Sequence, residues 1–180
     1  SAFINSSHSH NYECTIVRYQ NIIGPEMGFG HAIPHIVERF VKEEKSPFKI
    51  YGHNQTRAFC YIDDAVKGTV GAMESEKAAG EIYHIGKQDE ISMETLTKYI
   101  GKLMDYRGGY EAAMTYPGSV ERRCPNIDKA RSDFGYSPNI DWKKAVSLTT
   151  DWYSDFFNSG QSPQFGGFEA PEVISAELKK

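Results

Sequence analysis

The sequence lacks a basic excess and a long apolar run, and each absence excludes a class of protein. Its 180 residues include 20 basic and 24 acidic side chains, for a net charge of -4. There is therefore no general positive field to attract nucleic acid. The mean hydropathy is -0.53, and no apolar run approaches the roughly 20 residues that span a bilayer. We expect a soluble, cytoplasmic protein that binds neither nucleic acid nor a membrane.

The sequence also lacks the spacing of a disulfide framework or a metal site. The three cysteines, Cys14, Cys60 and Cys124, are far apart in the chain. Six histidines occur, including the i,i+4 pair His31 and His35, but without carboxylates or cysteines at ligand spacing. We expect free thiols in a reducing compartment and no metal.

What is present is an alternation of strand and helix patterns, which predicts an α/β fold. Strands are predicted at 13–19, 48–52, 57–62, 81–86 and 113–116, and helices at 31–45, 63–73, 92–108, 126–135 and 141–158. A short polar turn separates the second and third strands and predicts a small hairpin. Asp63 and Asp64 are predicted to cap one helix, and Ser92 and Asn126 to cap two others.

Composition predicts one domain over residues 1–158 and a tail over 159–180. The tail is rich in Gly, Pro and Ser, and we expect it to be loose or packed on the surface. The opening residues Ser1–Phe3 include neither an initiator Met nor a signal sequence. We expect that the natural protein extends further upstream.

Several short motifs follow one another in a fixed order. They are Arg18–Pro25 (RYQNIIGP), Ile33–Pro34, Ile50–Gly52 (IYG), Gln55–Asp64 (QTRAFCYIDD), Glu81–Gly86 (EIYHIG) and Arg122–Ile127 (RRCPNI). In this order the chain resembles the extended short-chain dehydrogenases that act as NAD-dependent nucleotide-sugar epimerases and dehydratases. The resemblance implies the C-terminal portion of an extended Rossmann-type fold. That portion comprises the last strands of the sheet and a small mixed α/β subdomain that binds substrate.

The resemblance implies a site for the diphosphate of a nucleotide sugar. Planar guanidinium groups bind phosphate oxygens bidentately. Arg57 and Arg123 stand where the family places its diphosphate-binding arginines, and Arg122 is a neighbouring candidate. Asn21 stands where a side-chain amide of the family meets phosphate or sugar. UDP-sugars or dTDP-sugars are the ligands that this resemblance implies.

The resemblance also implies contacts to the base, the sugar and the cofactor. Ile50 and Tyr51 resemble a strand that lies beside the base, although an ordinary core strand is the alternative interpretation. Tyr19 and Pro25 flank a loop that approaches the nicotinamide ring of NAD in the family. His31 follows this loop and is a candidate substrate contact.

Two features that the hydride chemistry of this family requires do not occur in the sequence. One is the Gly-rich turn that lets a pyrophosphate approach a helix N-terminus. The other is a helical Tyr-x-x-x-Lys pair. The only match to the second, Tyr83 with Lys87, lies in a predicted strand, where these side chains do not meet as they do on a helix. We expect the catalytic residues upstream of Ser1 and no activity of this chain alone.

One residue bears on the reaction type. The Gln55–Phe59 segment most resembles UDP-glucuronate decarboxylases, which carry an arginine directly after Gly-Pro, whereas this chain has Glu26. A carboxylate there would repel a sugar carboxylate. We therefore predict epimerase or 4,6-dehydratase chemistry on a neutral sugar. The alternatives are a decarboxylase, a non-catalytic binding or regulatory module, and a degenerate subunit that pairs with an active homologue.

The resemblance implies that the N-terminal half of the family's fold is not in this chain, so surface that this half would cover is expected to be exposed. The strands at 14–19 and 82–85 are expected to belong to a larger sheet whose other strands are not in this chain. Unpaired strand edges and exposed apolar patches promote association. We expect a homo-oligomer.

Overall fold

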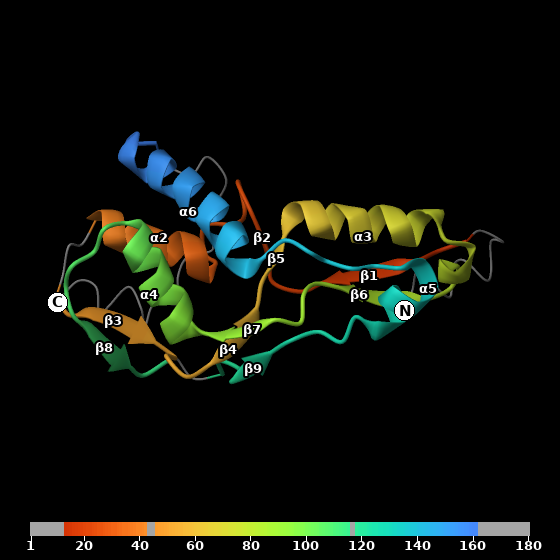
Figure 1. The fold of residues 1–180 in the computed structure, drawn as a ribbon, viewed down its shortest axis with the longest axis horizontal. Helices are drawn as coiled ribbons and strands as arrows, with labels where there is room; N and C mark the ends of the chain where they lie inside the picture. The colour runs from red at the N-terminus through yellow and green to blue at the C-terminus, as the bar shows by residue number, and fades with distance from the viewer. Residues whose placement is uncertain (1–12, 43–45, 116–117, 162–180) are drawn as a thin grey trace. The chain divides into compact units, whose positions relative to one another are not determined.

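The computed structural model describes residues 13–42, 46–115 and 118–161, and these residues form an α/β protein (Figure 1). They make up two compact units. Unit 1 takes in the described residues up to Ile23, with Arg57–Glu90 and Arg123–Trp142. Unit 2 takes in the described residues of Gly24–Thr56 and Ile91–Arg122, and those from Lys143 onward. The predicted tail at 159–180 lies outside the described residues, apart from its first three.

Unit 1 is built on two parallel strands. β1 (Ile16–Tyr19) pairs with β6 (Ile82–Ile85), with Tyr19 opposite Ile85 at the end of the register. A second parallel pair joins β2 (Ile22–Ile23) to β5 (Cys60–Tyr61). Because parallel strands end at the same edge, the segments that follow β1 and β6 leave the sheet side by side.

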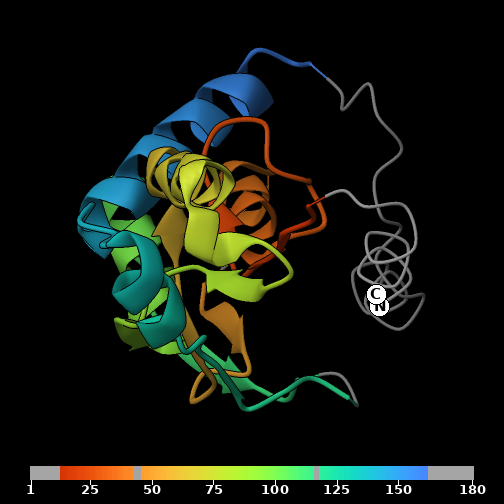
Figure 2. The same ribbon diagram turned by 90° about the vertical axis from the view of Figure 1, so that its right-hand side faces the viewer.

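Helix α3 (Ile62–Glu74) and a 3-10 turn (Glu76–Ala78) connect β5 to β6 in unit 1. The helix lies along the β1–β6 pair in Figure 1, and Figure 2 views it close to end-on. Its buried positions carry small residues, among them Ala65, Gly68 and Ala72. A Cβ atom at position 68 would lie 2.7 Å from the ring of Tyr136. Glycine at this position therefore lets the aromatic ring pack directly on the helix backbone.

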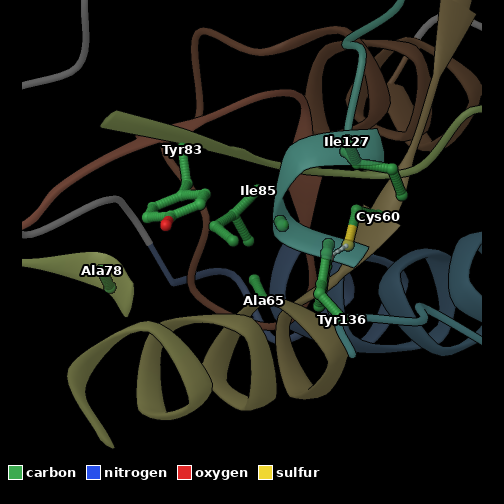
Figure 3. Packing of buried hydrophobic residues seen from close by; sticks show 8 residues of the cluster. Cys60, Ala65, Ala78, Tyr83, Ile85, Ile127 and Tyr136 are labelled. Carbon is green, nitrogen blue, oxygen red and sulfur yellow. Dashed lines mark hydrogen bonds between the residues drawn. The ribbon is translucent and has the colours of Figure 1, made fainter. Parts of the chain in front are cut away.

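The core of unit 1 is a cluster of buried side chains from α3, β5, β6 and the segment around α5 (Asp128–Phe134), shown in Figure 3. Its members include Tyr83, which is 1% exposed, and Ile85, which is fully buried. Burying a side chain of this size contributes roughly 1.5–3 kcal/mol. The thiol of Cys60 lies 3.5 Å from the hydroxyl oxygen of Tyr136, the hydrogen bond drawn in Figure 3.

One predicted helix cap, Ser92, is confirmed, whereas the cap position of α5 is Ile127, without a side-chain cap, and not Asn126 as predicted. The Asn126 Oδ1 accepts a hydrogen bond of 2.8 Å from the Asp128 N–H at the start of α5. Gly135 ends this helix with a φ of 71°. Ser92 caps α4 (Met93–Leu103), since its Oγ accepts from the Thr95 N–H at 3.0 Å.

The predicted cap at Asp63 and Asp64 is wrong. The residue before α3 is Tyr61, and no side chain caps this end. Asp64 lies within the first turn and is 1% exposed. Its Oδ2 accepts a hydrogen bond of 2.8 Å from the Ile140 N–H, and Lys87 donates to the carbonyl of Ile140. The carboxylate was therefore not available as a cap, because it ties the segment before α6 to the helix.

Unit 2 packs three helices with a parallel strand pair. The elements are α2 (Ala32–Lys42), β3 (Phe48–Tyr51), α4, β8 (Tyr110–Ala113) and α6 (Trp142–Asn158). The strands β3 and β8 run parallel, with Phe48 opposite Tyr110. Phe40 of α2 stacks on Phe48, with ring centroids 3.9 Å apart. Arg39 is 8% exposed and places its guanidinium 4.1 Å from the centroid of the Phe48 ring.

The predicted hairpin of 48–52 with 57–62 is also wrong. β3 pairs with β8 instead, and β4 (Thr56–Ala58) lies between β7 (Glu90–Ser92) and β9 (Arg122–Arg123). Both edges of β4 are thus occupied by strands that are distant in sequence. A polar turn between two strands predicts their pairing only when no other strand competes for the same edge.

One face of α3 exposes apolar side chains. Ile62, Val66, Val70 and Met73 are 41%, 53%, 40% and 75% exposed, and their spacing places them along a single stripe. The opposite face of the helix is the one that packs on the core. Across the part of the chain that the structure describes, no helix is both long and apolar enough to cross a membrane.

We expect this stripe on α3 to mediate association of the chain. Replacing Val66, Val70 and Met73 by Gln keeps the helix propensity high while removing the apolar surface. The triple variant should bind less of a hydrophobic dye and show a lower mass by light scattering. Its free energy of unfolding should change by about 0.5 kcal/mol or less, as for other surface substitutions.

Met114→Gln is the matched control, because Met114 is 92% exposed but lies outside the stripe. It should leave association unchanged. Equal masses for the wild type and the triple variant would contradict a role of the stripe.

Candidate functional site

The carboxyl-terminal edge of the β1–β6 pair gathers the sequence-predicted residues of unit 1. The Gln20 N–H donates to the Ile85 carbonyl at 2.9 Å, so the segment at 20–21 leaves the sheet beside the segment at 86–87. In open α/β sheets, ligands bind outside the carboxyl ends of the strands. A ligand site is therefore expected at this edge.

Gly86 brings a third segment to this edge. A Cβ atom at position 86 would lie 2.8 Å from the Pro125 Cγ and 3.1 Å from the Gln20 Cβ. These distances are too short for any side chain, so glycine is required for Pro125 to pack here. Pro125 follows Arg123 by two residues, and its contact with Gly86 holds the end of β9 at the sheet edge.

Asn21 connects the segments that carry the two predicted diphosphate ligands. Its Nδ2 donates to the Ala58 carbonyl at 3.1 Å and to the Arg123 carbonyl at 3.4 Å. Ala58 directly follows Arg57 in β4. The structure therefore brings the backbone of both arginine segments to one side chain. The predicted contact of these residues with a diphosphate stays a prediction.

The two arginines lie on neighbouring strands, since β4 and β9 are adjacent in their sheet. Arg57 is half-buried and Arg123 is exposed. Ala58 is fully buried, and successive side chains of a strand alternate in direction, so Arg57 points away from the face that buries Ala58. Two guanidinium-bearing strands held side by side are suited to binding an anion with several oxygens.

Arg122 differs from Arg123 in direction. Both residues form β9, and neighbouring side chains on a strand point to opposite faces. The strand geometry therefore favours only one of them as a partner for Arg57. Since Asn21 contacts the backbone of Arg123, we retain Arg123 as the predicted ligand and regard Arg122 as the weaker candidate.

The other predicted substrate contacts belong to unit 2. His31 is exposed and directly precedes α2, with its carbonyl accepting from the His35 N–H at 3.1 Å. Ile50 is 4% exposed, as expected for an ordinary core strand, so its side chain is covered by protein. Tyr51 is half-buried, and its ring centroid lies 5.3 Å from the guanidinium carbon of Arg39. The predicted roles of these three residues stay predictions.

The two predicted cofactor contacts are both accessible. Tyr19 is 52% exposed, and its hydroxyl is hydrogen-bonded to the Thr69 Oγ1 of α3 at 2.9 Å. Pro25 is exposed in the loop between β2 and α2. Their predicted contact with a nicotinamide ring stays a prediction.

Tyr83 and Lys87 do not form a catalytic pair, which agrees with the prediction from their strand position. The Tyr83 hydroxyl donates to the Asp133 carboxylate at 2.9 Å, whereas the Lys87 ammonium donates to the Ile140 carbonyl and pairs with Asp89 at 3.3 Å. Burial and the bond to Asp133 raise the pKa of Tyr83 to about 12. A tyrosine that shuttles a proton near neutral pH needs the opposite shift.

Metal and thiol chemistry find no support in the described residues. Within residues 13–42, 46–115 and 118–161, no three His, Cys, Asp or Glu side chains are arranged to hold a metal ion. The cysteines Cys14, Cys60 and Cys124 are free thiols. Burial raises the pKa of the Cys60 thiol, which keeps it protonated and unreactive.

Two small hollows in unit 1 are lined by neither Arg57 nor Arg123. Their volumes are about 180 and 280 Å³, below the roughly 300–1,000 Å³ of typical ligand pockets. The larger is lined by Lys87 and Arg131, but these cations already pair with Asp89 and Asp128 at 3.3 and 2.6 Å. We therefore place the candidate site at Asn21, Arg57 and Arg123 and not in either hollow.

Comparison with known proteins identifies the family. Residues 2–86 match the sequence profile of the NAD dependent epimerase/dehydratase family. These residues belong to that family. The match includes Asn21, Arg57 and the whole of β6. It confirms the resemblance that the ordered motifs carried, and the Rossmann-type α/β fold that the resemblance implied.

Relatives of the family extend the similarity beyond the matched residues. A UDP-N-acetyl-alpha-D-glucosaminuronate decarboxylase of Bacillus cytotoxicus is 32% identical over 153 residues, which are 80% of this chain and 47% of the relative. UDP-glucuronic acid decarboxylase 2 of Arabidopsis thaliana is 28% identical over 141 residues, which are 77% of this chain and 31% of the relative. The chain thus spans less than half the length of these relatives.

A solved structure shows the same arrangement of elements. It is the UDP-glucuronic acid 4-epimerase from Bacillus cereus in complex with UDP-glucuronic acid and NAD. The two proteins are 25% identical with a TM-score of 0.75, over 86% of this chain and 50% of that chain. The family to which this segment belongs therefore includes nucleotide-sugar epimerases and decarboxylases.

Sequence reasoning missed the residues that assemble the edge. Gly86 and Pro125 fix the position of β9, and Asp64 with Lys87 fixes Ile140. One signal was available, because a glycine directly after a strand often marks a close approach of another backbone. The role of Asp64 had no local signal, since its partner lies 76 residues away.

We expect Tyr83→Phe to change the stability of the protein at alkaline pH. The folded-state pKa of about 12 exceeds the ordinary value of 10.0, so folding favours the protonated phenol. This contribution to stability is fully present below pH 10 and is lost as the pH rises from 10 towards 12. The variant should be less stable by about 1 kcal/mol at pH 8, and this difference should narrow above pH 10.

Urea unfolding at several pH values measures this difference. Between pH 6 and 8 the gap between wild type and variant should stay constant, which serves as the internal control. A gap of constant size up to pH 11 would show that Tyr83 ionises as an exposed tyrosine does.

Proposed function

We propose that this chain supplies the nucleotide-sugar-binding part of an NAD-dependent epimerase or 4,6-dehydratase. Arg57 and Arg123 would hold the diphosphate of a UDP-sugar or dTDP-sugar. The observation that carries this proposal is the pair of hydrogen bonds from Asn21 Nδ2 to the carbonyls of Ala58 and Arg123. They hold both arginine-bearing strands at the sheet edge where ligands of such folds bind.

The net charge supports a site of this kind. With a charge of -4 the chain has no overall attraction for a diphosphate. Phosphate binding must then come from a few well-placed guanidinium groups, which bind two phosphate oxygens at once. The adjacency of β4 and β9, which carry Arg57 and Arg123, supports this assignment.

NAD is part of the proposal because of the family and because the Bacillus cereus relative is solved with NAD bound. In this chemistry NAD takes up and returns a hydride while the protein orients it against the sugar. The sequence carries no Gly-rich turn and no helical Tyr-x-x-x-Lys. This chain would therefore bind and orient the nucleotide sugar, and by itself would be inactive.

Decarboxylation is the second candidate, and the two relatives that are decarboxylases favour it. Glu26 argues against it. This residue is exposed in the loop before α2, with a φ of 59°. Burial raises the pKa of Tyr153 to about 12, and the nearby negative charge of Glu26 adds to this rise. A carboxylate at the position where the resemblance implies an arginine disfavours a second carboxylate on the sugar.

Replacing Arg57 by Gln should weaken the binding of UDP to this chain. The substitution keeps a polar side chain, although a shorter one, and removes the charge-assisted hydrogen bonds to phosphate. These are worth about 2 kcal/mol for a partly buried contact, which corresponds to roughly a thirtyfold increase in Kd. Isothermal titration calorimetry or an NMR shift titration measures the change.

Arg122→Gln is the matched control, since Arg122 carries the same charge on the same strand as Arg123 but points to the other face. It should raise the Kd by about twofold at most, through the loss of general charge. Equal weakening by both substitutions would mean that only net charge matters, and the proposed diphosphate site would be withdrawn.

Ligand preference separates the two candidate reactions. Because the resemblance implies that the residue after Gly-Pro faces the sugar, and this residue is Glu26, we expect UDP-glucose to bind more tightly than UDP-glucuronate. The difference should shrink in high salt because it is electrostatic. Tighter binding of UDP-glucuronate would instead favour a decarboxylase or another enzyme of acidic sugars.

A further inference from the structure

The aromatic end of α6 holds the loop that connects β2 to α2. This segment, residues 24–31, contains no helix or strand and is termed the 24–31 loop. The hydroxyl of Tyr153 donates a hydrogen bond to the carbonyl oxygen of Met27 in this loop. Tyr153 is fully buried, so water competes little for its hydroxyl. The loop is therefore attached to the helix at a defined point.

Phe29 attaches the same loop through its ring. The ring packs among three aromatic rings of α6, with centroid distances of 5.4 Å to Tyr153, 4.9 Å to Phe156 and 6.0 Å to Phe157. The pair with Tyr153 is edge-on, at 87°, an arrangement that aromatic rings favour. All of these residues belong to unit 2. A hydrogen bond at position 27 and a ring contact at position 29 thus restrain the loop at two points.

Glu26 has a backbone conformation that needs such a restraint. Its φ is 59°, in the left-handed region, where a residue with a Cβ atom is strained. Residues in this conformation persist where the surrounding structure over-determines them. The hydrogen bond from Tyr153 and the ring contact of Phe29 fall directly after Glu26 in the chain. They supply the surroundings that hold its backbone.

We propose that Tyr153 and Phe29 are positioning residues, which set through the 24–31 loop how much the sugar adds to ligand binding. This inference rests on the proposed function, since the predicted sugar contacts Glu26 and His31 lie in this loop. It adds α6 to the determinants of the site, although α6 lies outside residues 2–86, which match the family. The loop carries neither diphosphate-binding arginine, so its effect should be confined to the sugar.

The physical reason is conformational entropy. A loop that becomes ordered only when the ligand binds loses part of the binding free energy to that ordering. Three residues of the 24–31 loop, Gly24, Gly28 and Gly30, are glycines, which lose more backbone freedom on ordering than any other residue. Attachment of this loop to a buried tyrosine and an aromatic cluster removes the ordering cost before the ligand arrives. Tyr153 and Phe29 can therefore raise affinity without touching the ligand.

Tyr153→Phe isolates the hydrogen bond, because it keeps the ring and its packing. The contribution of the sugar is the ratio of the Kd for UDP to the Kd for UDP-glucose, both measured by isothermal titration calorimetry. We expect the variant to lower this ratio by about fivefold, the effect of losing one neutral hydrogen bond. The Kd for UDP alone should change by no more than about twofold.

Tyr106→Phe is the matched control. The Tyr106 hydroxyl also donates to a backbone carbonyl in unit 2, that of Gly109 at 3.0 Å, but this carbonyl is outside the 24–31 loop. The control should therefore leave both the ratio and the Kd for UDP unchanged.

A pair of substitutions at Phe29 tests the second attachment. Phe29→Ala removes the ring and should lower the ratio by about tenfold, since several aromatic contacts are lost. Phe29→Leu keeps an apolar side chain in the cluster and should restore part of the ratio. Equal weakening of UDP and UDP-glucose would indicate a general structural defect and overturn the proposal. A ratio that stays constant in both Tyr153→Phe and Phe29→Ala would also overturn it.

Hydrogen exchange without ligand distinguishes failure of this inference from failure of the proposed function. The His31 N–H donates to the Gly28 carbonyl at 3.1 Å within the loop, so its exchange rate reports opening of the loop. Tyr153→Phe should raise this rate by about fivefold, the effect of one lost hydrogen bond, and Tyr106→Phe should not.

The two measurements fail in different ways. If UDP binds to the wild type but the ratio and the exchange rate are the same in Tyr153→Phe, only the positioning role is overturned. If UDP does not bind to the wild type, the diphosphate site fails and the contribution of the sugar fails with it. The exchange rate then decides whether α6 holds the loop, and an unchanged rate overturns that attachment as well.

Discussion

The parallel pairing of β1 with β6 is the constraint on which the candidate site depends. Because both strands run in the same direction, the residues after Tyr19 and Ile85 leave the sheet at one edge. Gly86 then admits Pro125 at a distance that no side chain at position 86 would allow. The location of Arg123 thus follows from a strand pairing and from one glycine, both far from it in sequence.

Electrostatics explain why this geometry matters. A chain with a net negative charge does not attract a diphosphate through its overall electrostatic potential. Binding must therefore depend on where individual guanidinium groups lie. In water, exposed arginines contribute little to the free energy of binding unless their arrangement matches the ligand. The short strands β4 and β9 are adjacent in their sheet, and the Asn21 amide bonds to the backbone of both.

Local signals in the sequence were sufficient for part of the fold. Ser92 and Gly135 were predicted as helix boundaries, and the structure confirms them because capping involves only residues within a few positions. The predicted hairpin was wrong because β3 and β4 each pair with strands elsewhere along the chain. The role of Asp64 was wrong for the same reason. Its hydrogen-bond partner, Ile140, is near only in the folded protein.

The sequence by itself determined the α/β class and the family, because motif order and residue type can be read without any knowledge of contacts. The same resemblance predicted one site for Asn21, Arg57 and Arg123. Only the tertiary structure decided that the Asn21 amide bonds to the backbone of Ala58 and Arg123 and that β4 lies beside β9. Whether an amide faces a ligand or a carbonyl, and which of two adjacent arginines faces its partner, depends on strand pairing and on hydrogen bonds between distant segments, which no local pattern encodes.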